Sequence, residues 1–114
     1  LRLLQKVLEE KNIDFQITLI PQPWQFAEEQ NALKPFYGFK DFLLPRGGLE
    51  DHLHHFCHQQ GIPFLPLYPA FAQHKVTSSE RLYFTFDGHW TPAGHRLAAQ
   101  TIFDLLPPQN QAIE

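Results

Sequence analysis

The sequence predicts an α/β fold with a short parallel sheet, and the order of its hydrophobic patterns carries that prediction. Apolar residues recur at helical spacing in segments 1–12, 49–60 and 92–106. Two short apolar runs, 15–20 and 62–67, alternate with them as expected strands. Parallel strands need a long crossover between them, usually a helix, so this alternation is typical of a parallel sheet covered by helices.

Local signals support the first two helices and both strands. Asn12 ends the first helix, and the run FQITLI is then a largely buried strand that stops at Pro21. Gly61 ends the second helix, and two prolines weaken the ladder of the strand IPFLPL. A short helical turn is expected over 69–73 and an extended segment over 82–86. The residues expected to face the core are Leu1, Leu4 and Leu8 in the first helix and Leu49, Leu53 and Phe56 in the second.

The last helix has the clearest boundaries. Thr91 is the expected N-cap, and Pro92 suits the first helical position because its missing N–H is not needed there. Small residues such as Gly94 and Ala98 allow this helix to approach the sheet closely. Pro107 and its neighbour then end it.

Segment 22–48 is a long irregular connection, with one or two helical turns expected near 26–33. Connections of this length inside a compact domain usually have a task, often to line a site. This one starts at the carboxyl end of the first strand, where parallel sheets form their ligand crevices. Gln22 and Trp24 are therefore candidates for contact with an acyl or sugar group, while a Trp packed over the core is the simpler alternative.

The composition limits the classes of protein to which this chain can belong. The chain has 114 residues, enough for one domain, with 43% hydrophobic and 18% charged residues. A net charge of −3 gives no reason to expect nucleic acid or an anionic membrane as partner, and no apolar run approaches the roughly 20 residues of a membrane helix. A single cysteine, Cys57, excludes an internal disulfide. Because the chain contains no Met and opens on a helical pattern, we expect a fragment of a longer protein.

The stretch FDGHW before the last helix contains a carboxylate and an imidazole, and a turn alone does not require both. Asp87 and His89 are two residues apart, and their side chains converge only if the backbone folds at Gly88. A carboxylate bonded to one imidazole nitrogen fixes the ring and leaves the other nitrogen free to take a proton. The simpler alternative is that Asp87 caps a turn and His89 is an exposed loop histidine.

The wider segment LYFTFDGHWTPAGHRLAAQTI resembles the C-terminal catalytic block of SGNH (GDSL-type) hydrolases. In that family an Asp and a His stand on the last loop before the C-terminal helix, followed by a proline and a glycine, as Pro92 and Gly94 are here. LEEKNIDFQITLIPQP and CHQQGIPFLPLYPAF look like the two preceding helix-to-strand units. The family's commonest spacing is Asp-x-x-His. The shorter Asp-x-His with Trp90 after it is similar to the branch that includes alginate O-acetyltransferase-like proteins.

This resemblance implies that residues 1–114 are a single domain, or a fragment of one, from the C-terminal part of a three-layer α/β/α sandwich. His89 would be the general base and Asp87 its orienting acid, with Trp90 a candidate substrate contact. The family's Gly-Asp-Ser block is missing, and the only serines, Ser78 and Ser79, lie in a polar turn without a nucleophile elbow. The nucleophile is thus expected outside this chain, upstream or, as in the alginate branch, downstream.

The resemblance leaves three functions open. The resemblance implies an esterase acting on an O-acyl ester, with no metal or organic cofactor. The alternatives are an O-acetyltransferase of a cell-envelope polysaccharide and a non-catalytic module that binds carbohydrate or protein. The polysaccharide-modifying relatives favour the cell envelope or periplasm. In each case the rest of the domain is an expected partner, and the fragment alone is expected to be inactive.

One helix carries a histidine cluster, His52, His54, His55 and His58. The spacing of His54 and His58 suits a metal pair, but no third ligand is fixed by the sequence. Because the apolar residues define the opposite face, we expect these imidazoles to face solvent and Cys57 to be semi-buried. A histidine-mediated metal protein is the remaining alternative.

Overall fold

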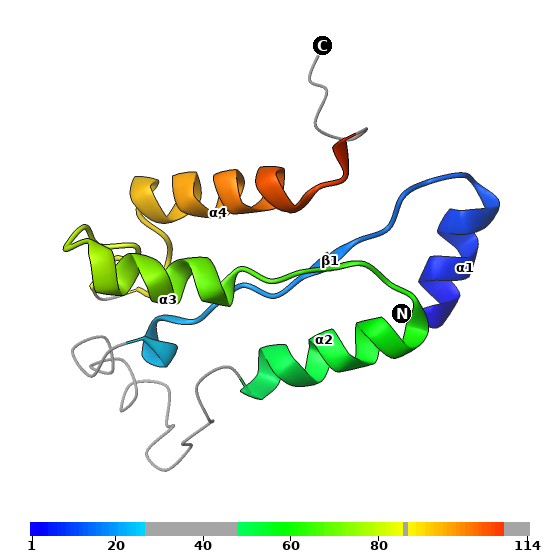
Figure 1. The fold of residues 1–114 in the computed structure, drawn as a ribbon, viewed down its shortest axis with the longest axis horizontal. Helices are drawn as coiled ribbons and strands as arrows, with labels where there is room; N and C mark the ends of the chain where they lie inside the picture. Colours follow the sequence, from blue (N-terminus) through cyan, green and yellow to red (C-terminus); the bar gives the residue numbers. More distant parts are fainter. Residues whose placement is uncertain (27–47, 86, 109–114) are drawn as a thin grey trace.

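The computed structural model describes residues 1–26, 48–85 and 87–108, without the side chain of Trp24. Its elements, in chain order, are helix α1 (Arg2–Glu10), strand β1 (Ile17–Thr18), 3-10 helix η1 (Pro23–Gln25), helix α2 (Gly48–Gln60), strand β2 (Phe64–Leu65), helix α3 (Tyr68–Thr77) and helix α4 (Pro92–Leu105) (Figure 1). Strands β1 and β2 pair in parallel, with Ile17 opposite Phe64. The predicted α/β class with a short parallel sheet is therefore confirmed, whereas the three-layer arrangement stays a prediction.

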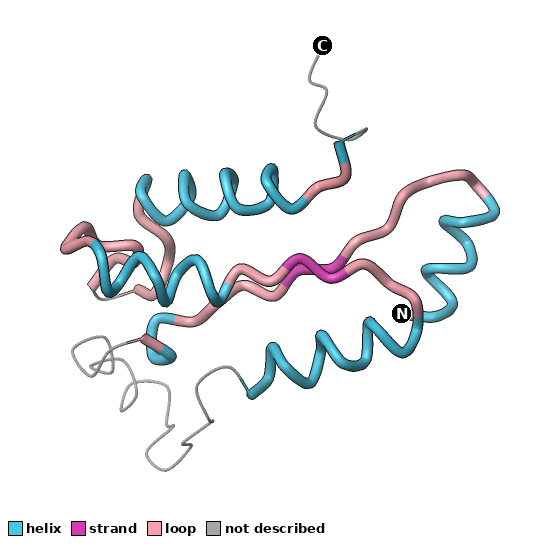
Figure 2. The backbone as a smooth tube through the Cα atoms, in the orientation of Figure 1, coloured by secondary structure: helices cyan, strands magenta, loops and turns pink. Residues whose placement is uncertain are grey.

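Both strands are shorter than predicted, as the two magenta segments of Figure 2 show. Within the described residues each strand has one neighbour, so the other edge of each lacks a ladder. Pro63, directly before β2, has no N–H to donate to a ladder. Its carbonyl still accepts the Ile17 N–H at 3.0 Å. The expectation that 15–20 is largely buried is wrong, since Ile20 is 55% exposed.

Helix α1 forms where the amphipathic pattern predicts it, but no described residue buries its apolar face. Of the residues predicted to face the core, Leu1 is 54% exposed, Leu4 is 47% exposed and Leu8 is half-buried. Arg2 Nε donates to Gln60 Oε1 and so ties α1 to the end of α2. Helix α3 also departs from expectation. It runs to Thr77, well past the short turn predicted over 69–73. The turns expected near 26–33 lie outside the described residues apart from Phe26.

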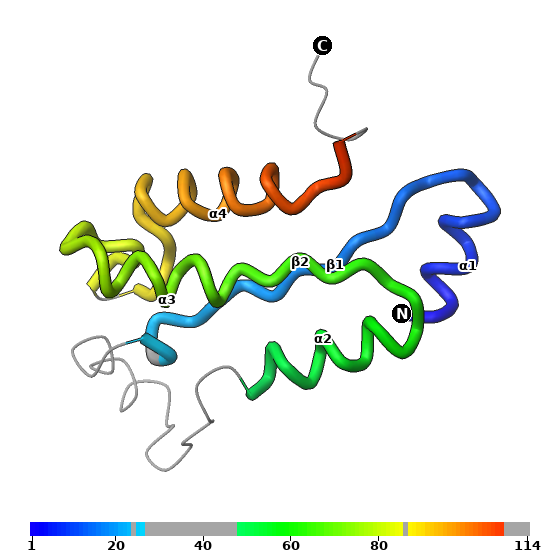
Figure 3. Tube along the Cα trace, in the orientation of Figure 1, coloured from blue at the N-terminus to red at the C-terminus, as the bar shows by residue number. Residues whose placement is uncertain are grey.

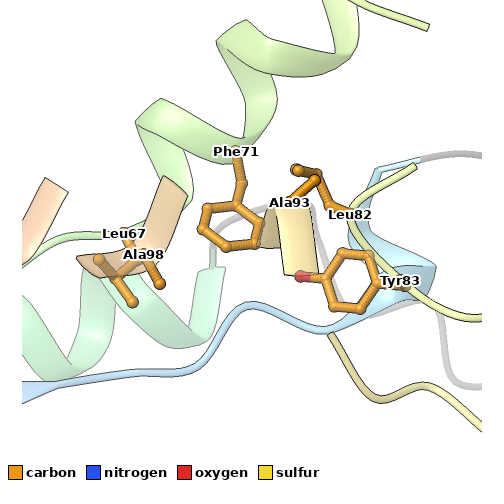
Figure 4. Packing of buried hydrophobic residues seen from close by; sticks show 6 residues of the cluster. All are labelled: Leu67, Phe71, Leu82, Tyr83, Ala93 and Ala98. Atoms are coloured by element: carbon orange, nitrogen blue, oxygen red, sulfur yellow. The ribbon is translucent and has the colours of Figure 1, made fainter. Parts of the chain in front are cut away.

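The main buried cluster lies where α3, the segment 82–83 and α4 meet (Figure 4). Its members are Leu67, Phe71, Leu82, Tyr83, Ala93 and Ala98. Phe26 and Trp90 pack against it while half-buried. This core fixes the segment that leads to Asp87 and His89, because Leu82 and Tyr83 are among its most buried residues.

The buried face of helix α2 is shifted from the predicted one. Leu53 and Phe56 are half-buried, but Leu49 is 54% exposed, and the most buried residues are Glu50 at 4% and Cys57 at 0%. The cause is a tertiary contact, since Glu50 Oε1 accepts the N–H of Tyr68, the first residue of α3, at 3.3 Å. The carboxylate thus serves a backbone donor that α3 leaves free at its start.

The burial of Glu50 predicts a pH-dependent stability. Burial raises the pKa of its carboxyl above the ordinary 4.5, and Oε2 has no hydrogen-bond partner among the described residues. The folded state therefore holds this proton more tightly than the unfolded state, so stability falls as the pH rises from 4.5 to the raised pKa. Glu50→Gln keeps an acceptor for Tyr68 and should remove that fall in the free energy of unfolding.

Urea unfolding of the wild type and Glu50→Gln across this pH range measures the effect. Glu10→Gln, at an exposed position of α1, is the matched control and should keep the wild-type pH slope. The same slope in Glu50→Gln and the wild type would contradict the prediction.

Gly94 gives a second stability prediction, because α4 and the chain at Leu82 approach each other there. A Cβ added at Gly94 would lie 2.3 Å from Leu82 O and 3.0 Å from Trp90 Cβ. Gly94→Ala should therefore destabilise the fold by about 1–3 kcal/mol through overpacking, despite the better helix propensity of Ala. Thermal unfolding checks this. Ala99→Ser, on the exposed face of α4, should cost no more than about 0.5 kcal/mol.

Candidate functional site

The predicted extended segment before Asp87 is one arm of a β-hairpin. Tyr83 forms an antiparallel bridge with Trp90. The Phe84 N–H donates to His89 O, and the Thr91 N–H donates to Leu82 O, both at 2.9 Å. The arm described ends at residue 85, since Phe86 lies outside the described residues. The segment therefore pairs with the chain just before α4 and is not a strand of the parallel sheet.

A buried hydrogen bond holds this hairpin at the carboxyl end of β1. Tyr83 Oη donates to Pro21 O at 2.7 Å, and burial raises the pKa of the Tyr83 hydroxyl, which keeps it a donor. Figure 3 shows η1, the chain after α3 and the start of α4 at the same end of the molecule. Tyr83 is not among the residues predicted from the sequence to carry function. Its only local signal is its place beside Leu82 at the start of an apolar run.

Contacts with both neighbouring helices brace the base of the hairpin. The Thr91 hydroxyl donates to Arg81 O at 2.6 Å and accepts the Gly94 N–H at 3.3 Å, so the predicted N-cap of α4 is confirmed. Glu80 forms an ion pair with Arg96 of α4 at 3.1 Å. His74 of α3 bonds the carbonyl of Glu80 at 3.1 Å through Nε2.

Asp87 contacts His89 twice. Its Oδ1 accepts the His89 backbone N–H at 2.9 Å, and its Oδ2 lies 3.4 Å from His89 Nδ1. Gly88 has a φ of +70°, the left-handed conformation that lets two neighbours of this kind fold together. Both side chains are accessible, with 57% of Asp87 and 82% of His89 exposed. The carboxylate thus closes the turn with one oxygen and faces the imidazole with the other.

The other predicted contact residues lie near the hairpin in different settings. Gln22 makes local bonds, its Nε2 donating to Ile20 O at 3.2 Å and its N–H to Gln25 Oε1 at 2.6 Å. Trp24 is part of η1. Trp90 packs against Phe71 with ring centroids 5.5 Å apart, and its buried Nε1 lies near the Tyr83 hydroxyl without a hydrogen bond of regular geometry. The roles of Gln22, Trp24 and Trp90 in substrate binding stay predictions.

Neither serine of the chain has the surroundings of a nucleophile. Ser78 ends α3, and its Oγ accepts the Glu80 N–H at 3.1 Å. Ser79 is exposed in the same turn. Among the residues that the structure describes, no hydrogen bond joins either hydroxyl to an imidazole. The place of the nucleophile therefore stays open.

The histidine-bearing helix α2 gathers no metal centre in the described part of the chain. No group of three His, Cys, Asp or Glu side chains could hold an ion there. His54 stacks on Phe64 with ring centroids 5.2 Å apart, and His55 Nε2 bonds Gln59 Nε2 at 2.9 Å. Cys57, predicted to be semi-buried, is fully buried, and burial raises the pKa of its thiol, which disfavours the reactive thiolate.

Across residues 1–26, 48–85 and 87–108, no helix is long and apolar enough to span a bilayer.

Comparison with known proteins relates this chain to a family of hydrolase-like domains. No match was found among curated proteins or among solved structures. A family model described as SGNH hydrolase-like domain, acetyltransferase AlgX, matches residues 1–114, which supports an acyl-related function on a hydrolase-like fold. The chain therefore belongs to the family of SGNH hydrolase-like domains of the acetyltransferase AlgX type.

Proposed function

We propose that this chain supplies the base and the orienting acid of an enzyme that cleaves O-acyl esters, with a nucleophilic Ser outside residues 1–114. The observation that carries the proposal is the double contact of Asp87 with His89, directly before α4. Family membership supports it, because the catalytic block that the sequence resembles has an Asp and a His in this position.

In this proposal Asp87 fixes the imidazole. The backbone bond to Oδ1 holds the carboxylate in place, and Oδ2 then faces Nδ1. A carboxylate on Nδ1 favours the tautomer with its proton there and stabilises the imidazolium that forms during reaction. Nε2 of His89 is left as the atom that exchanges protons with the reacting groups.

The chemistry then has two halves. His89 Nε2 takes the proton of the Ser hydroxyl as its oxygen attacks the acyl carbon, and returns that proton to the alcohol that leaves. A covalent acyl-Ser intermediate remains. In the second half His89 takes a proton from the incoming hydroxyl as its oxygen attacks the acyl carbon, and gives that proton to the Ser oxygen as the acyl–Ser bond breaks. Water as the incoming group gives hydrolysis, and a sugar hydroxyl gives transfer.

Transfer to a polysaccharide of the cell envelope is the second candidate, favoured by the acetyltransferase named in the family description. The two candidates share Asp87 and His89 and differ only in the acceptor. Product analysis of the complete protein with an acetyl donor, with and without an oligosaccharide acceptor, separates them. Acetate alone supports the esterase, and an acetylated sugar supports the transferase.

His89 should be essential in the complete protein. His89→Ala removes the base and should lower kcat on an activated acetyl ester by about 10⁴-fold, and Asp87→Asn should lower it by about 10³-fold or more. His52→Ala, an exposed histidine of α2, is the matched control and should keep wild-type kcat. Steady-state ester hydrolysis measures this. Wild-type rates in His89→Ala would refute the catalytic role and favour a non-catalytic binding module.

The serines of this chain give an independent prediction. Because the Ser78 hydroxyl is engaged in its own turn and the nucleophile is proposed to lie outside residues 1–114, Ser78→Ala and Ser79→Ala should each keep kcat within about twofold of wild type. The same ester assay on the complete protein tests this. A loss of about 10³-fold or more in either variant would place the nucleophile within this chain instead.

A further inference from the structure

We propose that Phe84 is a substrate-contacting residue, whose ring binds the apolar C–H surface of the ester next to the bond that is cleaved. This inference rests on the proposed function, because it gives the proposed base His89 a partner on the substrate side. Phe84 is not part of the Asp-x-His motif, and only the hairpin register brings it to the site.

The register places Phe84 across from His89. Tyr83 and Trp90 are bridge partners, and the next residues along the two arms, Phe84 and His89, are linked by the bond from Phe84 N–H to His89 O. Residues opposite each other in an antiparallel pair have side chains on the same face, with Cβ atoms roughly 4.5–5.5 Å apart. Successive residues of a strand alternate between the two faces.

Burial falls along the hairpin from the core toward the turn. Leu82 is fully buried and Tyr83 is 2% exposed, and both belong to the buried cluster, against which Trp90 also packs. Phe84, the next residue toward the turn, is 51% exposed, and the His89 side chain is 82% exposed. The register thus pairs an accessible aromatic side chain with an accessible imidazole across the hairpin.

Asp87 ends the ladder at this pair. A regular antiparallel pair would also send the His89 N–H to the Phe84 carbonyl, but that N–H goes to Asp87 Oδ1 instead. The same carboxylate that faces the imidazole therefore ends the strand pairing at Phe84. The remaining backbone hydrogen bond, from Phe84 N–H to His89 O at 2.9 Å, holds these two residues opposite each other.

An aromatic ring beside a base is suited to the apolar part of an ester. It buries C–H surface at small conformational cost and excludes water from the neighbouring carbonyl. The acyl chain and the carbon skeleton of the alcohol both present such a surface. Contact with either one lowers KM by binding ground state and transition state alike.

The experiment measures KM and kcat separately in the complete protein. Phe84→Ala should raise KM for p-nitrophenyl acetate by about fivefold or more and leave kcat within about twofold. Phe84→Leu keeps apolar surface and should recover part of the loss. Val76→Ala, which shortens an apolar side chain that is 82% exposed on α3, is the control and should leave KM unchanged. Thermal midpoints equal to that of wild type show that both Phe84 variants are folded.

Two substrate series identify the part of the ester that Phe84 contacts. A KM effect that grows from p-nitrophenyl acetate to the butyrate supports contact with the acyl chain. An effect that changes between p-nitrophenyl and 4-methylumbelliferyl acetate supports contact with the alcohol. Unchanged KM for every ester in folded Phe84→Ala, with His89→Ala inactive, overturns this inference and leaves the proposed function standing. Full activity of His89→Ala overturns both.

Discussion

The hydrogen bond from Tyr83 to Pro21 is the interaction on which the arrangement at this end of the molecule depends. It joins residues 62 positions apart, at 2.7 Å, in a buried setting. Loss of either partner would leave a buried polar group unsatisfied, which is costly in a core. Because Tyr83 pairs with Trp90 and Trp90 directly follows His89, this bond connects the end of β1 to the Asp87–His89 turn.

Helix α4 was predictable because its determinants are local. Thr91 and Pro92 define its start in both sequence and structure, and the structure ends it one residue before the predicted limit at Leu106. The buried face of α2 was not predictable in this way. Glu50 turns inward because its carboxylate bonds Tyr68, 18 residues later in the chain, and no periodicity in 49–60 encodes that contact. The strand lengths were predicted wrongly for the same reason, because the pairing partners of a strand and its uncovered edge are non-local properties.

In the candidate site, too, one feature was predictable from the sequence and another was not. The convergence of Asp87 and His89 followed from the spacing and from Gly88, whose left-handed φ of +70° is one that glycine adopts at little cost. The pairing of Phe84 with His89 across the hairpin required the register, because alternation along one strand gives the face of a residue but not the residue opposite it. The apolar residues Leu82 to Phe84 look alike in sequence, yet Leu82 and Tyr83 are buried and Phe84 is 51% exposed.

The turn at Asp87 does not need the imidazole of His89 for its stability. The turn is closed by Asp87 Oδ1 and the His89 backbone N–H, a bond that any residue except proline at position 89 would supply. The side-chain contact of Oδ2 with Nδ1 joins two exposed groups, 57% and 82% accessible, and contacts of that kind contribute little to stability because water screens them. An exposed imidazole that adds little to the fold, next to a carboxylate that the turn holds in place, is what the proposed role in proton transfer requires.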